Sequence, residues 1–403
     1  MPKRQITSAT EPRTSKRKKS GKSANVKTTT PDNQPTYSMD PDYYFEDGSV
    51  ILLVQDVLFK VHASLLKAQS QVFQDMFTMP AGDATIRIEG SSNQYPIVIP
   101  QVEPSQFRKL MQMIYSPASS AFHSSLYPTS NDDSSLETKA WSAFTFYLDV
   151  ATLCHRFGMV EMENWTKKKL QTLILSSKWA LASSAKSNPR LLLSAIEYAR
   201  MTQDNELIAH IQQFTYYYIC APGLDLEYED LMTLFRTPGL RENHPSVLGC
   251  IFSVFLGGHH TDWEDELFTR FDRMALFAGQ VRLSPVPKSL KKGIRVPLFE
   301  KPPSLERFRK MVKLTMCDSS PPCSHGCDQT IMNIWLDAFD DDYYEDDIEG
   351  SSLSLLPSCR AEFLEYTQDM QCCRGCSSEF INQLNEDIEL VYVRLGEYYR
   401  EIE

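Results

Sequence analysis

Residues 47–66, DGSVILLVQDVLFKVHASLL, decide the fold at the start of this 403-residue chain. Two runs of β-branched and other apolar residues, at 50–54 and 57–61, are separated by only two residues, the length of a tight hairpin turn. From His62 onward the apolar residues follow the spacing of a helix instead of a strand. The stretch therefore predicts a β-hairpin that runs directly into a helix.

The chain beyond this stretch continues with short elements of both kinds. Two short helices are expected around Ser70, a residue type that caps helices, and residues 97–99 form a third short strand. Pro104 occupies the first turn of an amphipathic helix. Residues 116–139 predict a flexible insertion, after which Gly158 separates two helices. A small sheet covered by a helix cluster accounts for this order better than a helical bundle or a parallel sheet.

These blocks resemble the BTB/POZ domain family in sequence and in order. The run 47–54 is similar to the first strand of that family with its preceding aspartate, and 59–66 is similar to the second strand and first helix. The run 70–77 resembles the helix that follows, and the likeness covers about residues 40–178. The resemblance marks seven residues as determinants of the fold or of an interface. They are Asp47, His62, Leu65, Leu66, Phe73, Met76 and Phe77.

The resemblance implies an α+β domain that binds other proteins and forms a homodimer. It also offers the role of substrate adaptor for a cullin-type ubiquitin ligase. No kelch or MATH repeat is visible downstream, as in stand-alone members of the family. No strand is evident before Asp47, which departs from family members that dimerise by exchanging such a strand. The alternative is that the aromatic residues 43–45 occupy the same groove.

Composition divides the chain into five parts. Apolar residues make up 42% of the sequence, which is enough for buried cores. We expect a disordered basic tail at 1–39, the BTB/POZ-like domain at 40–178 and a helical region at 179–282. Residues 283–303, with five prolines, predict an extended basic linker, and residues 304–403 predict a Cys-rich helical region.

The net charge of −11 hides a strong asymmetry between the tail and the rest of the chain. Residues 1–36 hold nine basic and two acidic residues, whereas the remainder holds 32 basic and 50 acidic residues. An acidic body repels phosphate backbones, so the folded part is not expected to bind nucleic acid. The tail carries two basic clusters that suit a bipartite nuclear import signal, the alternative being a solvated tail without a receptor. The clusters are Lys3, Arg4, Lys16, Arg17, Lys18 and Lys19. We expect the nucleus in preference to the cytoplasm.

Cysteine usage is the sharpest chemical anomaly. The longest apolar stretch, residues 247–258, is shorter than the ~20 residues of a membrane helix, and no apolar segment follows Met1. We therefore expect a soluble chain without membrane contact and with mostly reduced thiols. Seven of the ten cysteines fall in the final 87 residues, and two pairs have the spacing of zinc knuckles, although the pairs lie far apart for a compact zinc module. The alternative is packing as small apolar side chains. The ligands of such a structural zinc would be Cys323, Cys327, Cys373 and Cys376.

Signals of catalysis are weak in this sequence. There is no phosphate-binding glycine loop, no G-x-S-x-G elbow and no H-E-x-x-H motif. Cys154 and His155 are adjacent on a predicted helix, where neighbours point in different directions. The pair His259 and His260 and the acidic run 340–347 are more often solvated than metal-binding. We predict a non-enzymatic interaction protein without a cofactor, unless the cysteines hold zinc. The alternative is a nuclear transcriptional regulator that uses the basic tail and a C-terminal zinc module.

Overall fold

The computed structural model describes most of the chain outside the N-terminal tail. The described residues are 37–78, 89–116, 133–176, 181, 190–220, 228–312, 326–344, 352–368 and 374–400. The predicted import signal therefore lies outside the described residues. The same holds for residues 117–132 of the predicted insertion and for Cys323 and Cys373.

The predicted hairpin and third strand are present at the predicted positions. β2 (Val50–Val54) and β3 (Val57–Val61) pair antiparallel, and β4 (Ile97–Ile99) pairs in parallel with β2. Gln55, in the turn of the hairpin, has a φ of 54°, the left-handed conformation that tight hairpin turns require. Every residue of β2 is buried, because side chains cover this strand on both faces of the sheet.

A further strand precedes Asp47, which corrects the expectation that none is there. β1 (Ser38–Tyr44) pairs in parallel with β3 and gives the sheet the order β1-β3-β2-β4. The buried side chain of Asp40 accepts hydrogen bonds from two backbone amides of its own segment and from the Nε of Arg108, at 2.5 Å. The sequence did not predict this strand because a charged residue lies at its centre. Arg108, which stabilises Asp40 there, is 68 positions away in the chain.

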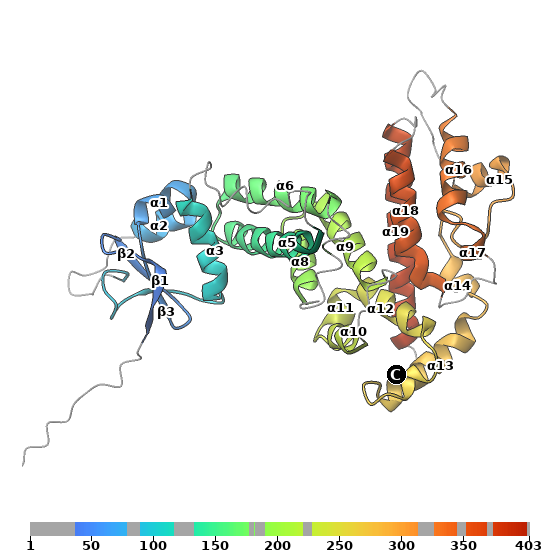
Figure 1. Ribbon diagram of the computed structural model, residues 1–403, viewed down its shortest axis with the longest axis horizontal. Helices are drawn as coiled ribbons and strands as arrows, with labels where there is room; N and C mark the ends of the chain where they lie inside the picture. The colour runs from blue at the N-terminus through green and yellow to red at the C-terminus, as the bar shows by residue number, and fades with distance from the viewer. Residues whose placement is uncertain are drawn as a thin grey trace, which may run out of the picture.

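Helices cover one side of this sheet (Figure 1). They are α1 (Ala63–Gln69), α2 (Gln71–Thr78) and α3 (Pro104–Tyr115). α5 (Asp133–Arg156) packs against α3 and pairs with α6 (Val160–Ser176), and both lie on the side of α3 away from the sheet (Figure 1). The Oγ of Ser70 accepts a hydrogen bond from the amide of Phe73, which confirms Ser70 as the cap between α1 and α2. Phe59 of β3 and Phe107 of α3 join sheet to helices, with ring centroids 4.9 Å apart. Gly158, with a φ of 62°, makes the predicted break between α5 and α6.

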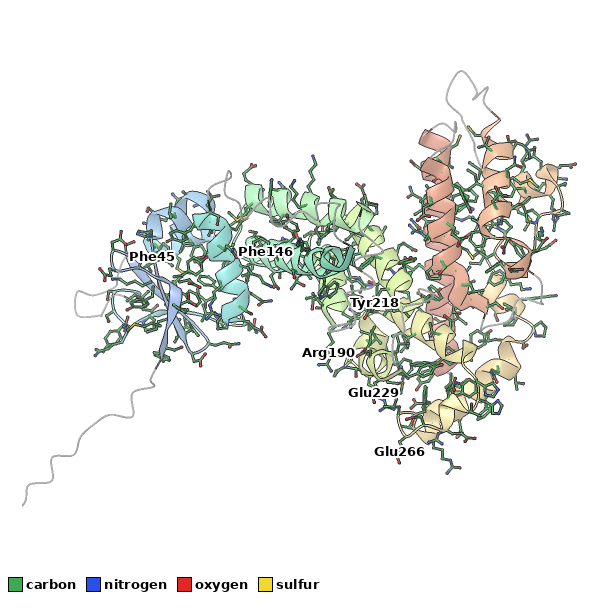
Figure 2. All side chains as sticks on the ribbon, in the orientation of Figure 1. Phe45, Phe146, Arg190, Tyr218, Glu229 and Glu266 are labelled. Atoms are coloured by element: carbon green, nitrogen blue, oxygen red, sulfur yellow. The ribbon has the colours of Figure 1, made fainter. Side chains whose placement is uncertain are left out.

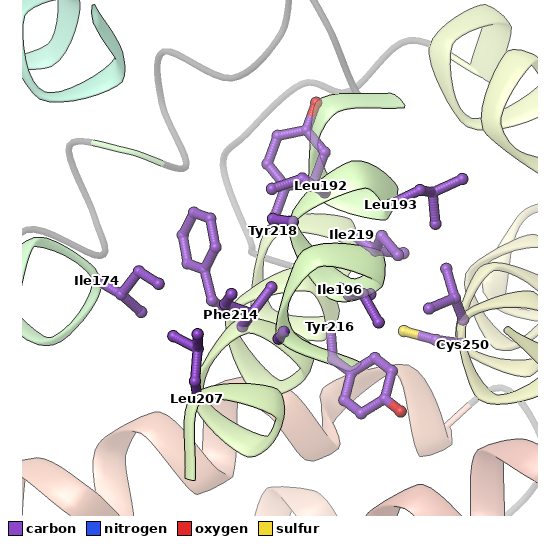
Figure 3. Packing of buried hydrophobic residues seen from close by; sticks show 14 of the residues in the cluster. Ile174, Leu192, Leu193, Ile196, Leu207, Phe214, Tyr216, Tyr218, Ile219 and Cys250 are labelled. Atoms are coloured by element: carbon purple, nitrogen blue, oxygen red, sulfur yellow. The ribbon is translucent and has the colours of Figure 1, made fainter. Parts of the chain in front are cut away.

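The rest of the described chain is helical. Its elements are α8 (Arg190–Met201), α9 (Asn205–Cys220), α10 (Tyr228–Phe235), α11 (Leu240–Asn243), α12 (Pro245–Gly257), η2 (Asp262–Glu264), α13 (Arg270–Leu283), α14 (Lys288–Lys291), α15 (Leu305–Val312), α16 (Cys327–Ala338), α17 (Asp341–Tyr344), η3 (Ser352–Leu355), α18 (Leu356–Gln368) and α19 (Arg374–Arg400). The core of this region forms where α8, α9 and α12 meet, and Figure 3 shows Leu193, Ile196 and Ile219 beside Cys250 there. α12 is the most apolar of these helices and is surrounded by other elements. At 13 residues it is short, and no helix among the described residues has the length and apolar character needed to cross a membrane.

Residues 283–303 are packed into the fold, which corrects the expectation of an extended linker. Five hydrophobic side chains of this segment are buried: Leu283, Val286, Leu290, Val296 and Leu298. The buried carboxylate of Asp387 in α19 accepts hydrogen bonds from the backbone amides of Arg295 and Val296, at 2.6 and 2.8 Å. The proline-containing segment therefore packs against α19 and does not act as a spacer between two domains.

The described elements form an elongated arrangement (Figure 1). The sheet with α1, α2 and α3 lies at one end, and the long helix α19 with α16 and α18 lies at the other. α5, α6, α8 and α9 connect the two ends. Figure 2 gives the same view with Phe45 at the sheet and Glu266 near the opposite end.

Candidate functional site

The junction between β3 and α1 holds a polar and aromatic cluster around His62. Its Nε2 lies 3.3 Å from the Oδ2 of Asp47, and its Nδ1 lies 2.9 Å from the hydroxyl of Tyr115. The same hydroxyl accepts a hydrogen bond from the backbone amide of His62. The ring of Phe45 packs against the rings of both His62 and Tyr115. The hydrogen bond from His62 lowers the pKa of Asp47, whose side chain is exposed. Through His62 the cluster connects the segment before β2 to the end of α3, and the described groups around the imidazole include no nucleophile.

Two of the residues carried over from the resemblance lie in the core. Leu66 and Phe73 are 1% and 0% exposed, and the ring of Phe73 packs between those of Phe77 and Phe157. They are therefore determinants of the fold and are not available to a partner. Met76 and Phe77 are half-buried against the same core.

Apolar side chains remain exposed on the outer side of these two helices. Leu65 in α1 is 39% exposed and Val72 in α2 is 41% exposed. We call these two residues, with Met76 and Phe77 at their border, the α1–α2 surface. Val72 also lies beside the turn at Gly158, since a Cβ placed on that glycine would be 3.5 Å from its side chain. The core beneath is already filled, so the α1–α2 surface is apolar area that the monomer leaves in contact with water.

The edge strands of the sheet also carry exposed apolar side chains, which the sequence analysis did not identify. Val98 in β4 is 61% exposed, and β4 pairs only with β2 in the described sheet. Met39 in β1, at the opposite edge, is 56% exposed. Exposed apolar edges of a sheet are sites where another chain can add.

The cysteines predicted to bind zinc are only partly placed by the structure. Cys327 begins α16, Cys376 lies in the first turn of α19, and both are buried. Cys323 and Cys373 lie outside the described residues. Within the described ranges there is no group of three or more His, Cys, Asp or Glu side chains that could hold a metal ion. The zinc site therefore stays a prediction.

The other candidate chemical groups do not converge on a site. Burial raises the pKa of the Cys154 thiol, whereas the neighbouring His155 is partly exposed and lies 2.9 Å from the carboxylate of Glu163. His259 and His260 stack on each other in an exposed loop, with ring centroids 4.2 Å apart. These arrangements contain no nucleophile aligned with a base.

Comparison with known proteins gives one match. Residues 46–140 match the family model of the BTB/POZ domain, the range that contains the sheet, α1, α2, α3 and the first part of α5. Neither a curated protein nor a solved structure matches the chain. Domains of this family are protein–protein interaction domains. The chain therefore carries a BTB/POZ domain at residues 46–140, and a helical region follows it.

Proposed function

We propose that this protein is a non-enzymatic interaction protein that self-associates through its BTB/POZ domain. The observation that carries the proposal is the α1–α2 surface, where Leu65 and Val72 stay exposed above a core that Leu66 and Phe73 already fill. Burial of such side chains stabilises a complex by about 25 cal/mol per Å² of apolar area. A second copy of the chain is the partner that the family resemblance implies.

The second part of the proposal is an adaptor role for a cullin-type ubiquitin ligase. The BTB/POZ domain would bind the scaffold, and the helical region would carry the substrate. The elongated arrangement supports this division, because the sheet and the helices around α19 lie at opposite ends (Figure 1). The two ends could therefore be occupied at the same time.

Co-purification of two differently tagged copies of the full chain tests self-association. The double substitution Leu65→Asp and Val72→Asp places two charges on the α1–α2 surface and should abolish co-purification, because an interface tolerates unpaired charge poorly. Thr172→Asp is the matched control. Thr172 is exposed on α6, and an aspartate there can interact with Lys168 one turn earlier.

The control variant should co-purify as the wild type does, and circular dichroism should show that all variants keep their helices. Equal co-purification of the double variant and the wild type would place self-association elsewhere.

A further inference from the structure

A cavity of about 790 Å³ lies between α9, α18 and α19, outside the BTB/POZ domain. Its volume is in the range of sites that hold small molecules or the side chains of bound peptides. Part of the wall is apolar, formed by Leu175, Ile208, Ala209, Leu364 and Ile381. The remaining lining is polar, and three of its groups have unused hydrogen-bonding capacity.

Arg360 in α18 is the cation of this cavity. Its Nε donates to the Oδ1 of Asn385 at 2.6 Å, and no carboxylate among the described residues forms an ion pair with it. Burial lowers the pKa of Arg360 to about 10, so the guanidinium remains charged at neutral pH. A guanidinium has five N–H donors in a planar fork, and within the described ranges one of them, the Nε–H, is hydrogen-bonded.

Two neighbouring groups on α9 are also incompletely hydrogen-bonded. The side chain of Gln213 is 5% exposed, lines the cavity and has an Oε1 without a hydrogen-bond partner among the described residues. The buried Nδ1 of His210 likewise has no hydrogen-bond partner among the described residues. Burial lowers the pKa of His210, and the nearby charge of Arg360 adds to this effect although Glu206 opposes it. Unpaired buried polar atoms destabilise a protein, so their presence around one cavity indicates groups that a ligand completes.

The acidic residues of the lining restrict the charge of such a ligand. Glu206, Glu386 and Glu389 face the cavity together with the single cation. Glu386 is paired with Arg295, and the Oε1 of Glu389 accepts a hydrogen bond from Gln212 at 2.8 Å. A doubly charged phosphate would meet several carboxylates with only one compensating cation. A planar anion with one charge matches the guanidinium fork and avoids this repulsion.

We propose that this cavity binds a carboxylate that has a hydrogen-bond donor close by. The guanidinium of Arg360 takes the carboxylate oxygens, the Oε1 of Gln213 accepts the neighbouring N–H or O–H, and the ring of His210 donates the remaining hydrogen bond. A free organic acid and an acidic residue of a bound peptide share this chemistry. The site is separate from the α1–α2 surface, so each proposal can fail without the other.

Titration calorimetry on the full chain tests the proposal with two probes. One is N-acetylglutamate, and the other is a hexapeptide with blocked ends and one central glutamate. We expect at least one of them to bind, and the tighter one identifies the source of the carboxylate. Replacing the central glutamate of the peptide by glutamine should abolish its binding, and inorganic phosphate should not compete. Absence of binding by both probes up to about 10 mM, or displacement by phosphate, would overturn the proposal.

Three variants connect the binding to the named groups. Arg360→Leu should weaken the affinity at least about tenfold, whereas Arg360→Lys, which keeps the charge, should lose less. Gln213→Leu should weaken binding and leave the melting temperature of the free protein unchanged or higher, because it removes an unpaired buried oxygen. Gln212→Leu is the matched control for the effect of Gln213→Leu on the melting temperature. It should lower the melting temperature, since its Nε2 donates to Tyr216 and Glu389. Unchanged affinity in Arg360→Leu would contradict the assignment.

Discussion

The backbone of Gly249 in α12 lies directly against the carbonyl oxygen of Tyr392 in α19. A Cβ placed on Gly249 would come within 1.8 Å of that oxygen, far inside van der Waals contact. Gly396, one turn further along α19, faces the backbone of Pro245 in the same way. Glycines on both helices therefore allow the backbones of α12 and α19 to approach each other closely, and this contact attaches the C-terminal helix to the core.

Gly249→Ala should destabilise the protein by about 3 kcal/mol or more, because the added methyl group forces the two helices apart. Gly375→Ala is the control, since this glycine also lies in α19 and its Cβ position has no neighbour within 4 Å. Alanine should be neutral or stabilising there, by up to about 1 kcal/mol. Chemical unfolding of the two variants distinguishes the cases, and equal stabilities would refute the close contact.

Asp40→Ala should release β1 from the sheet. The substitution removes the acceptor of Arg108 and of two backbone amides, at a cost of about 1–3 kcal/mol. Hydrogen exchange should then become fast in residues 38–44 and stay slow in β2. Asp42→Ala, which changes an exposed residue of the same strand, should leave exchange unchanged. Protected β1 amides in Asp40→Ala would show that the Arg108 contact does not hold the strand.

The zinc prediction concerns the full chain purified without chelators. We expect one equivalent of zinc, lost in the double variant Cys323→Ser and Cys373→Ser and retained in Cys317→Ser. Elemental analysis decides the point. Less than about half an equivalent in the wild type would leave Cys327 and Cys376 as buried side chains of the core.

Residues 1–36 should direct a cytosolic reporter to the nucleus. Replacing Lys16, Arg17, Lys18 and Lys19 by alanine should abolish this enrichment, because import receptors bind such side chains in acidic pockets. Fluorescence microscopy of the two fusions measures the effect. An even distribution of the wild-type fusion would assign the tail another role.

The sequence was sufficient where local patterns control structure. The hairpin at 50–61, the cap at Ser70 and the turn at Gly158 depend on residues within one or two turns of each other, and all were predicted at the right positions. β1 was missed because its central aspartate is stabilised by Arg108, far away in sequence. The linker at 283–303 was wrong for a related reason, since prolines suggest an extended chain and reveal nothing of a long-range contact with Asp387.

The candidate sites show the same division. Helical periodicity identified α1 and α2 as amphipathic, but it could not tell that Leu66 is buried while its neighbour Leu65 is exposed. The cavity between α9, α18 and α19 was not predicted at all. Arg360 and Gln213 come from helices far apart in sequence, and neither belongs to a local motif.

The mass of the full chain in solution tests the central claim most directly. Light scattering at tens of micromolar should give twice the chain mass of 46.1 kDa for the wild type, and the single chain mass for the variant with Leu65→Asp and Val72→Asp. A stable dimer of this kind buries on the order of 2,000 Å², so dilution into the low micromolar range should leave the wild-type mass unchanged. A wild-type mass of 46.1 kDa at the highest concentration would contradict self-association through the BTB/POZ domain.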